Sequence, residues 1–126
     1  MTRQVDGFSI QPFAQLRFAR LAGANLAAAD LRFAVFRYAV LEEANLSGSN
    51  LNGADFHGAV LRNADLTLAD LRAADFGAAD LSGAALDGAR LQDARYDDET
   101  RFPDGFDPEA HRMQRVPSPW PESTRP

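Results

Sequence analysis

A five-residue period governs the apolar positions of the chain from Leu16 to Tyr96. Every fifth residue in this stretch is Leu, Phe or Tyr, and the residue two places earlier is Ala in every unit but one, which has Ser49. A period of five matches neither the alternation of a β-strand nor the 3.6-residue turn of an α-helix, so the chain must turn once in each unit. The pattern therefore predicts a repeat protein of the solenoid type.

A twenty-residue period is superimposed on the shorter one. The central residues are Leu except at Phe36, Phe56, Phe76 and Tyr96, which lie twenty residues apart. If each unit forms one side of a coil, four units complete a square coil and the aromatic residues stack in one column. Strand-like rungs pair at roughly 4.8 Å, so the seventeen units predict just over four coils and a height of roughly 20 Å.

The choice of residues fits a narrow square interior. Each side has room for one large central side chain, while the position two places earlier has room only for a methyl group. Burial of each central side chain should contribute roughly 1.5–3 kcal/mol. The predicted core consists of Leu16, Leu21, Leu26, Leu31, Phe36, Leu41, Leu46, Leu51, Phe56, Leu61, Leu66, Leu71, Phe76, Leu81, Leu86, Leu91 and Tyr96.

The unit A-(D/N)-L-x-x, as in Ala24-Asn25-Leu26 and Ala64-Asp65-Leu66, resembles the pentapeptide-repeat family. The resemblance covers residues 14–96 and implies an all-β fold, a right-handed quadrilateral β-helix, with the handedness carried over from the family. The segment from Tyr96 to Pro108 resembles the closing sequence of many bacterial members, cyanobacterial ones especially. The resemblance therefore implies a bacterial source.

The two ends of the repeat region need covers, because an open rung exposes unpaired backbone groups. Residues 1–13 lack the repeat and are predicted to form an N-terminal cap or extension, whose Phe8, Ile10 and Phe13 can fold over the first rung. Residues 97–116 are predicted to form the C-terminal cap.

Within the C-terminal cap, Phe102 and Phe106 are expected to cover the last coil. The sequence from Asp107 is a helix-start signal, with Pro at the first helical position, and predicts a short capping helix of about two turns through Gln114. Residues 117–126 are rich in proline and are predicted to be a disordered tail, in which Trp120 is either inert or a linear anchor.

Composition narrows the class of protein further. A chain of 126 residues with 45% apolar content indicates one domain. The absence of Cys excludes a disulfide framework and thiolate chemistry. No apolar stretch is long enough for a signal peptide or a membrane span, so a cytoplasmic location is expected.

Candidate catalytic and metal-binding residues are few. His57 and His111 are the only imidazoles. No second His or Cys lies within ligand reach of His57, and His111, near Glu109 and Arg112, is expected at the surface, so no metal site is expected. Asp55 and Asp75 should stack about 5 Å apart in one outer column, but both are exposed. Short, uniform turns leave no concave pocket for a substrate, so the sequence predicts neither enzymatic activity nor a cofactor.

The charge pattern bears on one function known in the family. Some bacterial members resemble B-form DNA, bind gyrase or topoisomerase IV and protect against quinolones, which requires an uncompensated anionic surface. Residues 14–96 hold ten acidic residues and eight arginines, a net charge of −2. Asp30 is expected to pair with Arg32, and Asp70 with Arg72, which reduces the anionic field. DNA mimicry toward gyrase, modulating quinolone sensitivity, is kept as the alternative function.

An outward-facing apolar patch near the N-terminal end is the better candidate site, because aromatic residues and Arg are enriched at protein interfaces. The candidate partner-binding residues are Phe18, Phe33, Val35, Tyr38, Arg17 and Arg37. In the competing interpretation, residues 1–13 fold back and cover the patch. The sequence thus predicts a non-enzymatic scaffold or interaction module. It would bind another protein or a second copy of itself, with no direct contact to nucleic acid or membrane.

Overall fold

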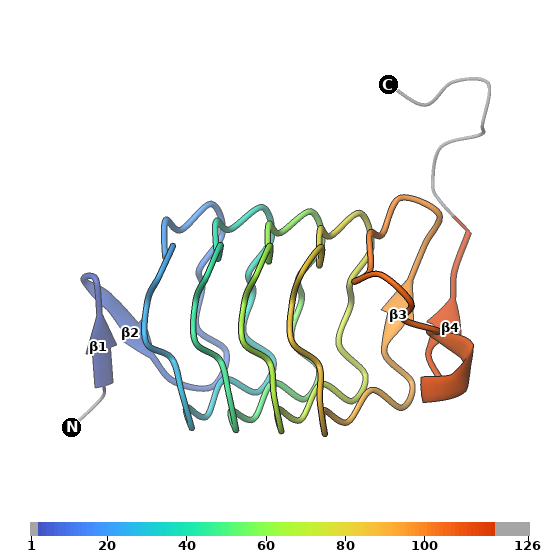
Figure 1. The fold of residues 1–126 in the computed structure, drawn as a ribbon. Coiled ribbons are helices and arrows are strands. Elements are labelled where there is room, and N and C mark those ends of the chain that lie inside the picture. The colour runs from blue at the N-terminus through green and yellow to red at the C-terminus, as the bar shows by residue number, and fades with distance from the viewer. Residues whose placement is uncertain (1–2, 118–126) are drawn as a thin grey trace.

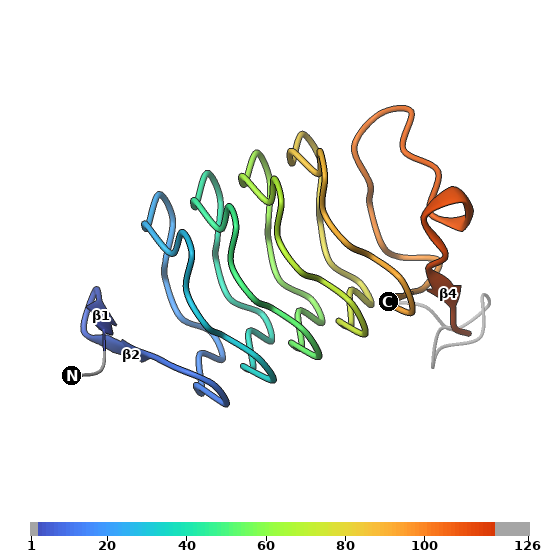
Figure 2. The ribbon, with the colours of Figure 1, turned by 90° about the horizontal axis from the view of Figure 1, so that it is seen from below.

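The computed structural model describes residues 3–117, which form a short tube of stacked coils (Figure 1). Residues on neighbouring coils pair in parallel at a spacing of twenty, for example Gln15 with Val35, Val35 with Asp55, and Asp55 with Asp75. Seen from below, the coils follow one another along the tube, between a hairpin at one end and a cap at the other (Figure 2). The predicted twenty-residue coil is confirmed.

A tight turn closes each five-residue unit. The N–H of the third residue after the central one donates back to the central carbonyl, as from Ala19 to Leu16 at 3.1 Å. The second residue after the central one has a positive φ, 58° at Phe18 and 68° at Gly58, as in a type II turn. Because a turn follows so soon, each side of the coil pairs through one residue and extended strands occur only at the ends.

The interior is lined by the central residues and the alanines before them. All the central residues from Leu16 to Tyr96 are buried except Leu86, which is partly buried. The Phe36 and Phe56 rings stack at 4.9 Å, and Phe56 and Phe76 at 5.2 Å, which matches the rung spacing.

The Asp or Asn of the repeat has a local role. Asp55 Oδ1 accepts the backbone N–H of His57 at 3.0 Å, and Asp65 Oδ1 accepts that of Thr67 at 3.0 Å. Such a side-chain bond to the amide two residues on stabilises the approach to a turn, which explains why short polar side chains recur before the central residue.

Two short strands form the N-terminal hairpin. Strand β1 (Arg3–Val5) pairs antiparallel with β2 (Phe8–Ile10) through a turn at Asp6 and Gly7. Both turn residues have positive φ, 51° and 83°, which suits the twist of a two-residue hairpin.

This hairpin covers the first open end of the tube. Ile10 is buried, and Val5 and Phe8 pack against the core. The Arg3 guanidinium donates to the carbonyls of Asn25 at 2.7 Å and Ala27 at 2.8 Å. Carbonyls that have no further coil to pair with are thus capped by a cation.

The predicted two-turn capping helix is wrong. The segment forms only a 3₁₀ helix, η1 (Glu109–His111), after which Arg112 takes a left-handed φ of 59°. The chain then enters β4 (Gln114–Arg115), which pairs in parallel with β3 (Arg95–Tyr96). The Gln114 N–H donates to the Ala94 carbonyl at 2.7 Å, so pairing with the last coil takes up the residues that would have extended the helix.

One inserted residue after Tyr96 shifts the register, because Asp80 pairs with Arg101 rather than with the residue twenty places on. The buried Asp97 carboxylate accepts the Ala78 N–H at 3.0 Å, and Thr100 Oγ1 donates to the Phe76 carbonyl at 2.9 Å. Polar side chains therefore form the hydrogen bonds to backbone groups of the preceding coil that backbone groups form in the other coils.

Two remaining sequence predictions concern the tail and the membrane. The predicted disordered tail, with Trp120, lies outside the described residues apart from its first residue. Within residues 3–117, no helix has the length and apolar character to cross a membrane.

Candidate functional site

Two stacks of exposed aromatic rings stand at the N-terminal end of the tube. Phe13 stacks on Phe33 with centroids 5.2 Å apart, and Phe18 stacks on Tyr38 at 5.4 Å. Phe13 and Phe18 are 66% and 69% exposed, although ring stacking covers one face of each. The two stacks stand at successive turns and so border one side of the coil.

Arginine and apolar side chains occupy the side between the stacks. Val35 is half-buried there, with Arg37 two residues on and Arg17 at the matching position one coil earlier. Arg37 Nε donates to Asp55 at 2.5 Å, a bond that raises the pKa of the guanidinium. Arg17 is exposed and forms no hydrogen bond or ion pair with residues 3–117.

We call this region the aromatic–arginine surface, and it comprises Phe13, Phe18, Phe33, Val35, Tyr38, Arg17 and Arg37. The sequence analysis placed all of these residues on it except Phe13, which it assigned to the N-terminal cover. The signal was available, because Phe13 lies five residues before Phe18 and twenty before Phe33.

The N-terminal segment does not cover this surface in the part of the chain that the structure describes. The Phe8 and Ile10 side chains pack against the core at the end of the tube, and Phe13 is itself exposed in the first stack. The interpretation in which these three residues shield the patch is therefore wrong for residues 3–13.

Glycine makes room for the second ring of each stack. A Cβ on Gly53 would collide with the Phe33 ring, and a Cβ on Gly58 would collide with the Tyr38 ring. Each ring thus lies flat along the tube over the glycine of the next coil, and the stack ends there. The side chains that follow are too small to continue it.

The charges of the tube are separated along its length. Residues 3–40 contain five arginines and two acidic residues, a net charge of +3, whereas residues 41–117 contain fifteen acidic residues and seven arginines, a net charge of −8. The aromatic–arginine surface therefore lies at the positive end. An acidic partner would be attracted to it.

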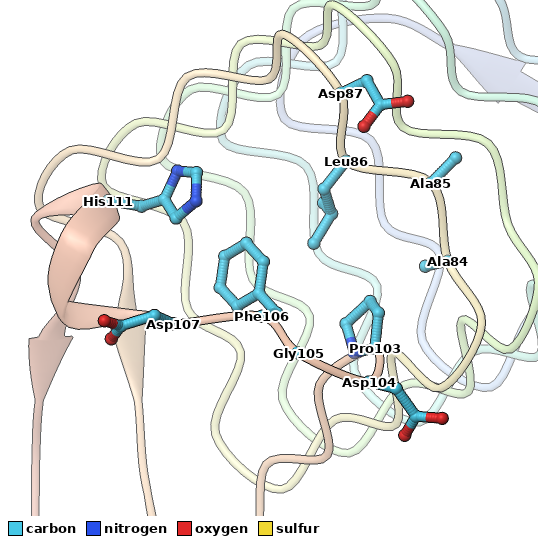
Figure 3. A pocket seen from close by; sticks show the side chains of 10 residues that line it. All are labelled: Ala84, Ala85, Leu86, Asp87, Pro103, Asp104, Gly105, Phe106, Asp107 and His111. Atoms are coloured by element: carbon cyan, nitrogen blue, oxygen red, sulfur yellow. The ribbon is translucent and has the colours of Figure 1, made fainter.

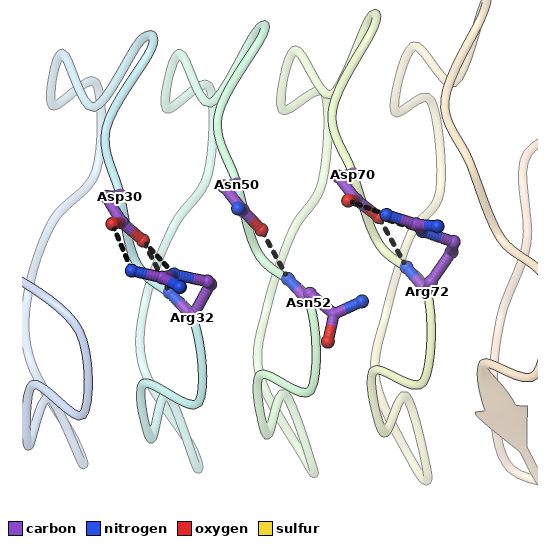
Figure 4. Close-up of polar contacts among 6 residues, drawn as sticks. All are labelled: Asp30, Arg32, Asn50, Asn52, Asp70 and Arg72. Carbon is purple, nitrogen blue, oxygen red and sulfur yellow. Dashed lines mark hydrogen bonds and ion pairs between the residues drawn. The ribbon is translucent and has the colours of Figure 1, made fainter.

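The predicted pairs on another side of the tube are confirmed (Figure 4). Arg32 Nη2 lies 2.8 Å from Asp30 Oδ2, and Arg72 Nη2 lies 2.7 Å from Asp70 Oδ2. In each pair the arginine hydrogen bond lowers the pKa of the carboxyl. Between them, Asn50 Oδ1 accepts the Asn52 N–H at 3.2 Å, so an uncharged rung separates the two pairs.

The stacked carboxylates do not form an acid–base pair. Asp55 is bound by Arg37, and Asp75 Oδ2 lies 3.9 Å from Arg95 Nη2. His57 meets the edge of the Tyr38 ring at 5.8 Å. His111 stacks on Phe106 at 4.6 Å, and residues 3–117 hold no cluster of three or more His, Cys, Asp or Glu suited to a metal ion.

Comparison with known proteins agrees with this geometry. The family model for pentapeptide repeats matches residues 14–53, 39–77 and 64–95, with eight copies. The chain belongs to the pentapeptide-repeat family.

Among solved structures, alr5209, a pentapeptide repeat protein from Nostoc PCC 7120, is 41% identical with a TM-score of 0.80, over 81% of this chain and 84% of that one. AT2G44920, a pentapeptide repeat protein from the Arabidopsis thaliana thylakoid lumen, is 34% identical with a TM-score of 0.65, over 74% of this chain and 59% of that one. No curated protein matches the chain.

The fluoroquinolone resistance protein QnrB1 is a distant match. It is 16% identical with a TM-score of 0.38, over 73% of this chain and 65% of that chain. This match carries no argument about the function of the present chain.

Proposed function

We propose that the chain is a non-enzymatic interaction module that binds another protein through the aromatic–arginine surface. The observation that carries the proposal is the exposure of Phe13, Phe18, Phe33 and Tyr38 in two ordered stacks. Large exposed apolar patches with neighbouring Arg are typical of protein-binding surfaces.

The backbone at these positions does not by itself identify a binding surface. All four aromatic residues have a left-handed φ between 58° and 63°, at the turn position that holds glycine in Gly23, Gly48 and four further units. Bulky residues pay of order 1–3 kcal/mol there, whereas stacking returns about 0.5–1.5 kcal/mol for each pair. Seven other non-glycine residues, among them Leu68, share this conformation at the turn position, so the support for binding comes from the gathering of four rings at one end of the tube.

The partner should present an acidic, partly apolar surface. The Arg17 guanidinium, which has no partner among residues 3–117, can bind such a surface, and the net charge of +3 on residues 3–40 favours its approach. A second copy of the chain could meet this description through its own acidic end. The cytoplasmic location expected from the sequence stays a prediction, because AT2G44920 comes from the thylakoid lumen.

Affinity capture from host extract with three forms of the protein tests this function. The Phe18→Gly/Tyr38→Gly variant removes one stack while supplying the residue that the turn prefers. Leu68→Gly is the matched control, because Leu68 is 74% exposed with a φ of 59° but lies away from the surface. Wild type and Leu68→Gly should retain the same partner, and the double variant should lose it. Equal capture by all three would refute the proposal.

Mimicry of DNA toward gyrase receives less support. Four of the ten acidic residues within residues 14–96, Asp30, Asp55, Asp70 and Asp80, are each bound by an arginine within 2.8 Å. Neutral pairs do not reproduce the field of a duplex. We therefore expect no inhibition in a gyrase supercoiling assay.

A further inference from the structure

The last coil leaves two adjacent sides without a pairing partner in the described chain, those centred on Ala85 and Arg90. On the inner edge, the Ala85 N–H donates to the Ala64 carbonyl and the Ala85 carbonyl accepts from Leu66, both at 2.9 Å. On the outer edge, the Ala84 carbonyl and the Leu86 N–H have no hydrogen-bond partner among residues 3–117. The Ala89 carbonyl and the Leu91 N–H also lack such a partner, so two sides of the tube end in open β-edges, of which the Ala84–Leu86 edge borders a hollow.

The path of the cap explains the gap. After Phe102 the chain turns through Pro103 and Gly105 and leaves the register that earlier coils follow. A hollow of about 360 Å³ remains between this segment and the last rung (Figure 3). Leu86 lies on the wall of this hollow, which is why it is the one central residue that is not fully buried.

The hollow combines an apolar wall with an acidic rim. Leu86 and Phe106 supply apolar surface, whereas Asp87, Asp104 and Asp107 supply carboxylates (Figure 3). These three carboxylates form no ion pair with an arginine in the described part of the chain. Within residues 3–117 no arginine lines the hollow, and its one basic side chain, His111, stacks on Phe106, so the three carboxylates make the hollow complementary to a cation.

The opposite end of the tube shows the chemistry that such an edge accepts. There Arg3 donates to two carbonyls that have no coil to pair with, and β2 covers the rung. The Ala84–Leu86 edge has free backbone groups of the same kind, and within residues 3–117 neither an arginine nor a strand pairs with them.

We propose that this edge binds an extended basic segment of a partner protein by adding one parallel strand residue. Its carbonyl accepts the Leu86 N–H and its N–H donates to the Ala84 carbonyl, as the Ala85 carbonyl and N–H do for Leu66 and Ala64 of the coil before. An apolar side chain meets Leu86 and Phe106, and flanking Arg or Lys side chains meet Asp87 and Asp104. This site lies at the acidic end, away from the aromatic–arginine surface, and is independent of it.

A peptide titration followed by NMR of the backbone amides tests the proposal. The probe is acetyl-Arg-Val-Leu-Val-Arg-amide, and two matched peptides replace both Arg by Glu or N-methylate the central Leu. The Arg peptide should shift the Leu86 amide saturably and slow its hydrogen exchange. The other two peptides should bind at least about tenfold more weakly, because the Glu peptide loses the charge pairing and the N-methylated peptide loses a backbone hydrogen bond.

A protein variant separates this edge from general attraction to the acidic end. Asp87→Asn/Asp104→Asn should weaken the Arg peptide about tenfold. The control Glu42→Gln/Glu43→Gln removes the same charge elsewhere and should leave affinity within about twofold. No Leu86 shift at ~1 mM peptide, equal binding of the Glu peptide, or equal loss in the control would each overturn the proposal. None of these outcomes bears on the aromatic–arginine surface.

Discussion

At the scale of the residue, size decides which side chain each position accepts. The last residue of each turn is Ala because the central side chains fill the bore, and Ser49 is accepted there because its Oγ donates to the Leu46 carbonyl at 2.5 Å. The Phe36, Phe56 and Phe76 column fills the same bore with stacked rings. On the outer surface, glycine is needed at positions 53 and 58 because a Cβ there would collide with the Phe33 and Tyr38 rings.

Removal of the middle core ring should be severe. Phe56→Ala leaves a cavity between two stacked neighbours and should lower the free energy of unfolding by about 3–5 kcal/mol, measured by urea denaturation. Phe56→Leu restores the residue found at most central positions and should cost about 1–2 kcal/mol. Equal losses in the two variants would contradict this view of the core.

A methyl group under the Tyr38 ring tests whether the contact between this ring and Gly58 is tightly packed. Gly58→Ala combines the left-handed φ with a collision and should cost about 2–3 kcal/mol, whereas Gly48→Ala should cost about 1 kcal/mol, because its φ is similar and its Cβ meets open space. In a Tyr38→Gly background the two glycines should become equivalent. If Gly58→Ala stays the more costly there, the ring is not the cause.

At the scale of the element, the coils follow their pattern and the caps depart from it. The register could be predicted because the central residues and the alanines repeat without a break. The structure of the closing segment could not be predicted. The extra residue after Tyr96 is accommodated by hydrogen bonds of the Asp97 and Thr100 side chains, which do not follow from the repeat pattern. The helix-start signal at Asp107 is followed by only one short 3₁₀ helix, because Gln114 pairs with the last coil instead of extending the helix.

Loss of the Asp97 carboxylate should loosen the end of the tube. Asp97→Ala leaves the Ala78 and Glu99 amides without their acceptor and should cost about 1–3 kcal/mol. Hydrogen exchange at Ala78 should rise, while that of Ala54 or Ala59 in the middle coils should change little. Asp104→Ala, an exposed change in the same cap, is the control and should leave exchange at Ala78 as in wild type.

At the scale of the whole molecule, the tube separates stability from recognition. Its interior is uniform along the axis, whereas its outer surface changes from aromatic and basic at one end to acidic at the other. The position of the aromatic–arginine surface could be predicted from the columns of the repeat. The open edge at Leu86 could not, because it depends on where the cap leaves the register.

The carboxylates of the outer surface should determine the pH below which the fold loses stability. Burial raises the pKa of Asp80, but the hydrogen bonds from Ser82 and Arg62 outweigh it and lower the pKa to about 2. The unfolded chain therefore binds protons first as the pH falls below about 4, and stability should be lost between about pH 4 and pH 2. Asp80→Asn should flatten this dependence in denaturation curves, and an unchanged slope would contradict the assignment.

The most direct test of the account measures stability and binding on the same variant. Once the partner is purified, calorimetric titration and urea denaturation are applied to wild type, Phe18→Gly/Tyr38→Gly and Leu68→Gly. We predict that the double variant loses no more than about 1 kcal/mol of stability relative to wild type, while its dissociation constant rises at least ~100-fold. The Leu68→Gly control should match wild type in binding. An unchanged dissociation constant in the folded double variant would contradict the claim that the aromatic–arginine surface binds the partner.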